Sequence, residues 1–145
     1  MTTDLHTSLT VNADLASLRA IGPWLGQNLQ NAGDQDVPGN LSTLELAVQE
    51  ICVNIVTYAY GVSYAYGGPS AAVIELSFAA DEAHYTVTTT DVGIAYDPST
   101  KPKVDLERPT IGGYGLFLTE SLCERLDYER SGNRNIWTLT FKRSS

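Results

Sequence analysis

The chain has 145 residues, 43% of them hydrophobic, and a net charge of -8 at pH 7, as fits a single globular domain over residues 1–145. The charge is uneven: residues 1–100 hold eleven acids and one base, whereas residues 101–145 hold eight bases and six acids. An acidic chain lacks the dense basic surface that the nucleic-acid backbone requires, so we expect no direct nucleic-acid binding. No apolar run reaches membrane-spanning length and no signal peptide is evident, so we expect a cytoplasmic protein without a membrane partner.

The N-terminal residues predict one strand followed by one helix. Apolar and polar residues alternate over residues 5–11, which predicts a strand. Asn12 is a candidate cap for a helix over about 13–31, and Gly22-Pro23 is expected to break or kink that helix.

The next segment predicts a loop and then the strongest helix of the chain. Residues 31–40 have the composition of a loop. Ser42 with Glu45 forms a capping-box pattern, which predicts a helix over about 43–60.

The remaining sequence predicts four strands, one helix and a long loop. The strands are expected over 71–78, 84–90, 126–131 and 135–142, with turns at 81–83 and 131–133, a loop over 97–113 and a helix over about 115–126. Because strands and helices do not alternate regularly, we expect an α+β fold: a two-layer sandwich with a mixed, mostly antiparallel sheet and helices on one face.

Three short clusters carry candidate chemistry. On the long helix, Glu50 and Asn54 are four residues apart and share a face, where a carboxylate is a candidate general base and an amide oxygen is a candidate Mg²⁺ ligand. A solvated polar helix face is the more frequent explanation of such a pair. Asp91 ends a predicted strand and Gly93 follows, a pair that suits an exocyclic amine and a flat ring but is also common in ordinary turns.

The third cluster is glycine-rich. Gly112, Gly113 and Gly115 precede a predicted helix, so their N–H groups are candidates for binding phosphate. The segment lacks the Gly-Lys-Ser/Thr of a P-loop, and a flexible hinge is the alternative.

Taken together and in order, the clusters resemble the N, G1 and G2 boxes of the Bergerat-fold, histidine kinase-like ATPases. The chain most resembles the small bacterial anti-sigma factor serine/threonine kinases, through E-x-x-x-N-x-x-x-Y-A-Y (50–60), D-V-G-I-A-Y-D-P (91–98) and G-G-Y-G-L-F-L (112–118). The resemblance implies the Bergerat fold, the cofactors ATP and Mg²⁺, and an ATP lid at about 97–113.

The resemblance also implies a role for particular residues. Glu50 occupies the position of the general base, Asn54 that of the Mg²⁺ ligand, and Arg108 lies in a lid segment whose arginine faces the terminal phosphate. The implied nucleotide-binding residues are Asn54, Asp91, Gly93, Ala95, Gly112, Gly113, Tyr114, Gly115, Leu116 and the strand threonine Thr138. Two residues depart from the family pattern: Tyr58 stands where His is usual, and Ala95 replaces the second glycine after Asp91.

By resemblance, the function is that of an anti-sigma regulatory factor. Such a protein sequesters a sigma factor and phosphorylates a STAS-type anti-anti-sigma protein on serine or threonine, and a homodimer is a further implied partner. A non-catalytic, nucleotide-gated regulator on the same fold is the main alternative. A histidine kinase fragment is disfavoured because neither His6 nor His84 lies in a predicted dimerisation helix, and a domain without a ligand is the remaining possibility.

Overall fold

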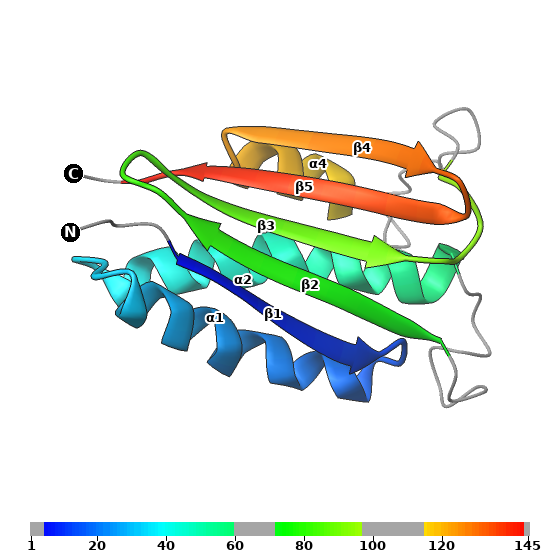
Figure 1. Cartoon of the computed structure of the whole chain (residues 1–145), viewed down its shortest axis with the longest axis horizontal. Coiled ribbons are helices and arrows are strands. Elements are labelled where there is room, and N and C mark those ends of the chain that lie inside the picture. Colours follow the sequence, from blue (N-terminus) through cyan, green and yellow to red (C-terminus); the bar gives the residue numbers. More distant parts are fainter. Residues whose placement is uncertain (1–4, 60–71, 97–114, 144–145) are drawn as a thin grey trace, which may run out of the picture.

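The fold is a single antiparallel sheet with helices packed on one of its faces (Figure 1). The structure is a computed structural model that describes residues 5–59, 72–96 and 115–143. The strands are β1 (Leu5–Asn12), β2 (Val73–Ala80), β3 (His84–Asp91), β4 (Arg125–Ser131) and β5 (Arg134–Lys142), in the order β1-β2-β3-β5-β4. Every neighbouring pair is antiparallel. The expected α+β architecture with helices on one face is thus confirmed, and no parallel pair occurs among the described strands.

In the part of the chain that the structure describes, the helical layer contains three α-helices, one 3-10 helix and one π-helix. They are the 3-10 helix η1 (Ala16–Ala20), α1 (Ile21–Asn31), α2 (Val37–Asn54), the π-helix η2 (Ile55–Ala59) and α4 (Gly115–Leu122). α2 lies between α1 and α4 and packs against both of them. The helices therefore cover the sheet with α2 at their centre.

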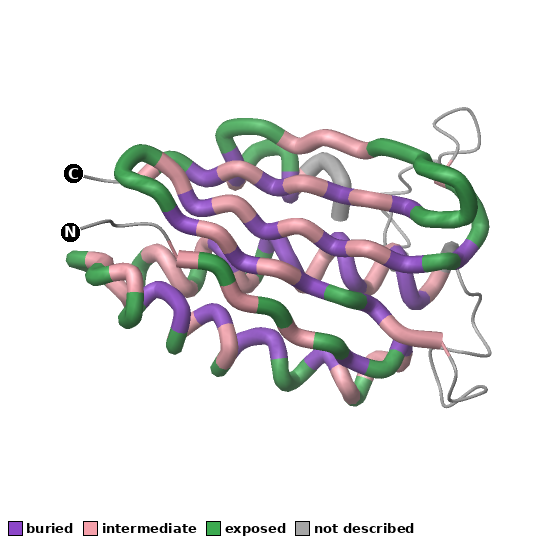
Figure 2. The backbone as a smooth tube through the Cα atoms, viewed as in Figure 1, coloured by how far each residue is buried: buried purple, intermediate pink, exposed green. Residues whose placement is uncertain are grey.

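The core lies between the sheet and the helices, and the strand pattern explains its position. Along β2, β3 and β5, buried residues alternate with partly exposed ones, so that one face of each strand meets the helices (Figure 2). Phe78 and Leu139 from this inner face are fully buried, as are Ile51 and Val48 of α2. Cys52 and Cys123 are both free thiols and both buried, as expected from their apolar surroundings.

The first helix begins later than the sequence predicted. Asn12 is the last residue of β1 rather than a helix cap. In the short turn that follows, Asp14 Oδ1 accepts a hydrogen bond from the Ser17 N–H at 2.7 Å. The α-helix starts only at Ile21, which places Pro23 in its first turn, where the missing N–H has no partner to lose. The expected interruption at Gly22-Pro23 is therefore a helix start.

The long helix begins six residues earlier than the capping-box pattern predicted. Asp36 is the N-cap of α2, and its Oδ1 accepts a hydrogen bond from the Gly39 N–H at 3.3 Å. Pro38 fits the first turn, because its missing N–H would have no partner there. Ser42, inside the helix, instead donates its hydroxyl to the Pro38 carbonyl. The prediction of a loop over 31–40 was therefore wrong for the last four of these residues, which form the start of α2.

The hairpins agree with the turns that the sequence predicted. Between β2 and β3, Asp81 Oδ1 accepts hydrogen bonds from the N–H groups of Ala83 and His84, both at 2.8 Å. Between β4 and β5, Gly132 has a φ of 60°, which glycine adopts at no steric cost. These two turns set the registers in which β2 pairs with β3 and β4 pairs with β5.

Candidate functional site

The C-terminal ends of α2 and β3 lie at the same end of the molecule (Figure 1). Glu50 and Asn54 belong to the last turns of α2, and Asp91 is the last residue of β3. The Asp91 charge contributes to raising the pKa of the Cys52 thiol on α2 to about 12, after the larger effect of burial. The structure thus brings two of the three predicted clusters to one end of the molecule.

Asp91 is a buried carboxyl group whose two oxygens differ. Asp91 is 2% exposed, and its Oδ1 accepts hydrogen bonds from the Gly93 N–H at 2.9 Å and from Asn135 Nδ2 at 2.8 Å. Its Oδ2 is buried and has no hydrogen-bond partner among the described residues. Burial raises the pKa of Asp91, while the bonds from Asn135 and Gly93 and the Arg130 charge lower it in part.

An unsatisfied buried carboxylate oxygen costs free energy, so it calls for a donor from outside the described residues. Three further buried polar atoms lack a partner among those residues: Asn54 Nδ2, Thr57 Oγ1 and Thr89 Oγ1. Thr89 precedes Asp91 by two residues on the inner face of β3, and Thr57 follows Asn54 by three residues. All four orphaned atoms thus come from the two segments that meet at this end of the molecule.

The backbone is irregular where these segments meet. Directly after Asn54, α2 continues as the π-helix η2, a form that occurs mostly as single turns and often at functional sites. Glu50 and Asn54 are partly exposed, one turn apart. A carboxylate and an amide on one accessible helix face are suited to take up a proton and to ligate a hard cation.

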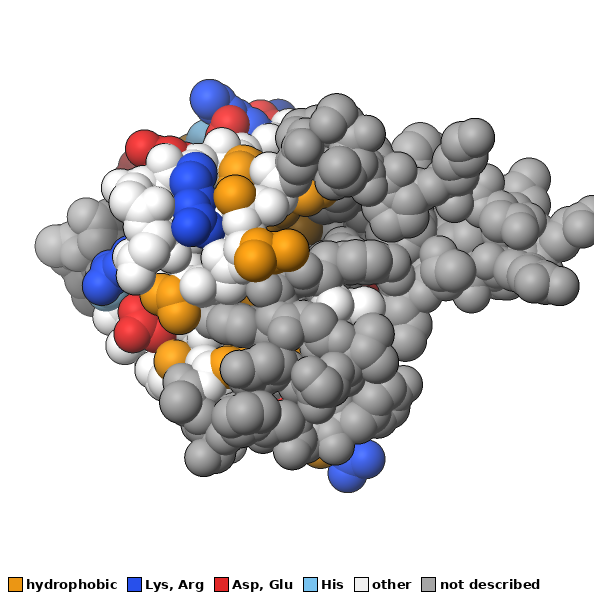
Figure 3. Space-filling view, turned by 90° about the vertical axis from the view of Figure 1, so that its right-hand side faces the viewer, with side chains coloured by type: hydrophobic (Ala, Val, Ile, Leu, Met, Phe, Trp, Pro, Cys, Tyr) orange, Lys and Arg blue, Asp and Glu red, His pale blue; other side chains and the backbone are white. Residues whose placement is uncertain are grey.

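The loop after β3 alternates between buried and exposed residues. Gly93 is buried, whereas Val92 and Ile94 are 54% and 70% exposed, and Ala95 is exposed too. Figure 3 looks onto this end of the molecule, and in its described part hydrophobic side chains lie beside Lys or Arg side chains. No described residue other than glycine has a positive φ, so the alanine at position 95 causes no backbone strain.

The remaining predicted site residues are placed as follows. Thr138 lies on β5 but belongs to the face of the sheet turned away from the helices, because Asn135 pairs with Asp91 and alternate residues point to opposite faces. Thr138 and Asp91 therefore lie on opposite faces of the sheet, and the nucleotide role of Thr138 stays a prediction. Gly115 and Leu116 open α4. Arg108, Gly112, Gly113, Tyr114 and the predicted lid at 97–113 lie outside the described residues.

Sequence reasoning missed five residues of this region: Thr57, Thr89, Tyr128, Arg130 and Asn135. Thr89 could have been found from the sequence, because it lies two residues before Asp91 on the same strand and therefore shares its face. Asn135 carried no such indication, because the turn before β5 sets it opposite Arg130, and only the pairing of β5 with the non-consecutive strand β3 sets it opposite Asp91. Tyr128 and Arg130 follow from Asn135, because both bond to its side chain.

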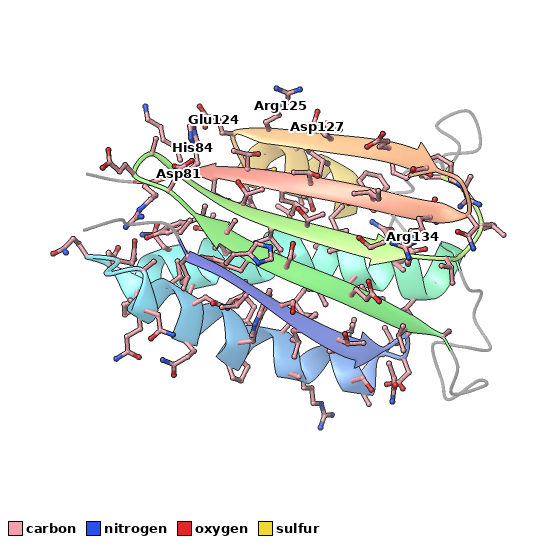
Figure 4. All side chains as sticks on the ribbon, in the orientation of Figure 1. Asp81, His84, Glu124, Arg125, Asp127 and Arg134 are labelled. Carbon is pink, nitrogen blue, oxygen red and sulfur yellow. The ribbon has the colours of Figure 1, made fainter. Side chains whose placement is uncertain are left out.

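Charged groups elsewhere form a separate set. His84 Nε2 and Glu124 Oε2 are 2.9 Å apart at the opposite end of the sheet from the end of β3, where Arg134 lies (Figure 4). Within residues 5–59, 72–96 and 115–143, no group of three or more His, Cys, Asp or Glu side chains is arranged to hold a metal ion. None of the helices in this part of the chain is long and apolar enough to cross a membrane.

Comparisons with known proteins agree with this geometry. The family model described as histidine kinase-like ATPase domain matches residues 11–141, so the chain belongs to that family. Its fold resembles the crystal structure of the RsbU and RsbW domains of Rv1364c from Mycobacterium tuberculosis, with a TM-score of 0.63 and 17% identity. That alignment covers 97% of this chain, which spans about a third (33%) of the solved one. No curated protein sequence matches significantly.

Proposed function

We propose that the chain is an ATP-dependent serine/threonine protein kinase that acts as an anti-sigma regulatory factor. The observation that carries the nucleotide site is the buried Asp91, which presents one unsatisfied oxygen beside a helix that bears Glu50 and Asn54. Membership of an ATPase-domain family and the fold shared with a solved chain that contains an RsbW domain support the regulatory part.

The residues present suit an adenine nucleotide. Asp91 Oδ2 is an acceptor that a purine exocyclic amine would satisfy, and Gly93 leaves space beside the ring because it has no side chain. The Asn54 amide would ligate Mg²⁺, and the backbone N–H groups at the start of α4, with Gly112, Gly113, Tyr114, Gly115 and Leu116, would face the phosphates. Ala95 would border the purine.

ATP with Mg²⁺ supplies the phosphoryl group when bound. Such transfer requires mainly positioning and neutralisation of charge, and one group must accept the proton of the attacking hydroxyl. Glu50 is the carboxylate on the accessible face of α2 and would take that proton from a serine or threonine of the protein substrate. Arg108, in a lid at about 97–113, would stabilise the charge on the terminal phosphate.

Two protein partners belong to the proposal: a STAS-type anti-anti-sigma protein as substrate and a sigma factor as the sequestered target. The solved chain with a similar fold carries an RsbU and an RsbW domain, so it joins two regulatory domains in one polypeptide. A homodimer and a cytoplasmic location complete the proposal.

The Glu50→Gln variant tests the kinase function. The amide keeps the size of the side chain but cannot accept the hydroxyl proton, so we expect phosphorylation of the STAS partner to fall about 100-fold or more. We expect the affinity for Mg-ATP to change less than threefold. Glu45→Gln on the same helix is the matched control and should transfer phosphate at the wild-type rate.

The measurement is transfer of labelled phosphate from ATP to the purified STAS protein, beside calorimetric titration with Mg-ATP. Wild-type transfer by Glu50→Gln would reject Glu50 as the base. A wild-type protein that binds ATP but never yields phosphorylated partner would support the alternative, a non-catalytic regulator whose partner binding is gated by nucleotide.

A further inference from the structure

Asn135 is a buried asparagine on the inner face of β5, directly opposite Asp91. It is 2% exposed, and its amide nitrogen lies 2.8 Å from Asp91 Oδ1, 3.1 Å from the Gly93 carbonyl and 3.0 Å from the Ile94 carbonyl. One side chain therefore holds both the carboxyl group of the site and the loop that follows it.

The other half of the same amide is also fully occupied. Asn135 Oδ1 accepts hydrogen bonds from the Tyr128 hydroxyl at 2.5 Å and from Arg130 Nη1 at 3.0 Å. Arg130 Nη1 also donates to the Gly93 carbonyl at 2.8 Å, and the Tyr96 N–H donates to the Tyr128 hydroxyl at 3.0 Å. Rotating the amide by 180° would turn its oxygen toward three acceptors and its nitrogen toward two donors, so only one orientation is compatible with these contacts.

Aromatic packing holds this network in place. The rings of Tyr96, Tyr128 and Trp137 lie with centroids 4.7 to 5.5 Å apart, in tilted or edge-on arrangements that favour attraction. Trp137 is the next inward-facing residue of β5 after Asn135. The C-terminal hairpin β4–β5 thus carries Asn135, Tyr128 and Arg130, which bond to the backbone of the loop after Asp91.

We infer that Asn135 is a positioning residue that makes Asp91 selective for 6-aminopurine over 6-oxopurine nucleotides, an inference that rests on the proposed function. Because Asn135 Nδ2 donates to Asp91 Oδ1, that oxygen is occupied as an acceptor, and Oδ2 is the one that lacks a partner among the described residues. An adenine amine donates to Oδ2, whereas the 6-oxo group of hypoxanthine would set two acceptors against each other.

Asn135 also favours the ionised form of the carboxyl group. Its hydrogen bond lowers the pKa of Asp91 against the opposing effect of burial. The other groups that face Asp91 are the Gly93 N–H, the Arg130 charge from β4, and the Cys52 thiol from α2, whose raised pKa keeps it neutral. Without the Asn135 amide, Asp91 would take up a proton at higher pH and lose its acceptor.

The test compares binding of Mg-ATP and Mg-ITP, the inosine analogue that lacks the amine, to the wild type and to Asn135→Ala between pH 5 and 8. We expect the wild type to prefer ATP at least about tenfold, the effect of one hydrogen bond to a charged group. We expect Asn135→Ala to reduce that preference below threefold and to lose ATP affinity at higher pH than the wild type does.

Asn28→Ala is the matched control. Asn28 is also a buried asparagine, 3% exposed, but it bonds to Thr7 and to the Trp24 carbonyl, away from the site. We expect it to lower the unfolding temperature and to keep the ATP preference. If Asn135→Ala does not fold, Tyr128→Phe removes one bond to Asn135 Oδ1 while keeping the ring, and should reduce the preference about threefold.

The outcomes separate the inference from the function on which it rests. A wild type that binds neither nucleotide overturns the proposed function and the inference together. A wild type that prefers ATP, beside an Asn135→Ala variant with the same preference and the same pH dependence, overturns the inference alone. An equal loss of ATP and ITP affinity at every pH would mark Asn135 as structural and would also overturn it.

Discussion

Asp91 combines burial in the core with a carboxylate oxygen that no described residue satisfies. Its raised pKa means that the folded protein holds this proton more tightly than the unfolded chain does. As the pH rises from the unfolded value of about 3.9 through the raised folded value, the free energy of unfolding therefore falls, and above that window the full cost of the buried charge remains. A stabilising partner for this charge is what a bound nucleotide would supply.

Without nucleotide, we therefore expect Asp91→Asn to stabilise the protein relative to the wild type at pH 7 and to lose this advantage at pH 3. Asp81→Asn is the control of opposite sign: the N–H groups of Ala83 and His84 lower the pKa of Asp81, so its contribution is present at neutral pH and lost on acidification. Thermal unfolding from pH 3 to 7 measures both. An Asp91→Asn variant that is less stable than the wild type at pH 7 would contradict the assignment.

At the scale of elements, α2 connects the site to the rest of the fold. Its C-terminal turns carry Glu50 and Asn54, while in its middle the Ala47 carbonyl accepts a hydrogen bond from the Thr119 hydroxyl of α4 at 3.2 Å. Thr119 is fully buried, so this bond is shielded from water. It fixes α4, and with it the start of that helix at Gly115, against α2.

Thr119→Val should therefore lower the free energy of unfolding by about 1 kcal/mol, the usual net worth of one buried hydrogen bond, because valine keeps the shape and removes only the hydroxyl. Thr86→Val, on the face of β3 turned away from the helices, is the control and should change stability by less than about 0.5 kcal/mol. Urea unfolding of the wild type and both variants measures these changes. A Thr119→Val variant as stable as the wild type would show that the hydrogen bond to Ala47 does not stabilise the fold.

The elements also show which parts of the fold were predictable. Period-two alternation located all five strands to within two residues at each end, because a strand with one buried face alternates apolar and polar residues. Helix starts were not predictable in this way: the composition of residues 31–40 indicated a loop, yet Asp36 caps a helix there and Pro38 is compatible with its first turn. The face on which Thr138 lies was not predictable either, because strand register, which decides the face, depends on pairing across the sheet.

At the scale of the whole molecule, the acidic and basic parts of the chain contribute different groups to the candidate site. Asp91 and the ends of α2 fall in the stretch between residues 20 and 100, which contains no lysine or arginine. A positive charge that acts on Asp91 lies on the C-terminal hairpin, where Arg130 donates hydrogen bonds to the Gly93 carbonyl and to Asn135. An acidic half therefore supplies the carboxylates, and the basic C-terminal third supplies the groups that hold the adjacent loop.

The most direct test of the central claim, that Asp91 receives the nucleotide, is calorimetric titration of the wild type and Asp91→Asn with Mg-ATP at pH 7.5. We expect one site in the wild type and an affinity about 10- to 100-fold lower in the variant, because a hydrogen bond to a charged group contributes about 1.5–3 kcal/mol. Equal affinities in the two proteins, or no binding by the wild type, would contradict it.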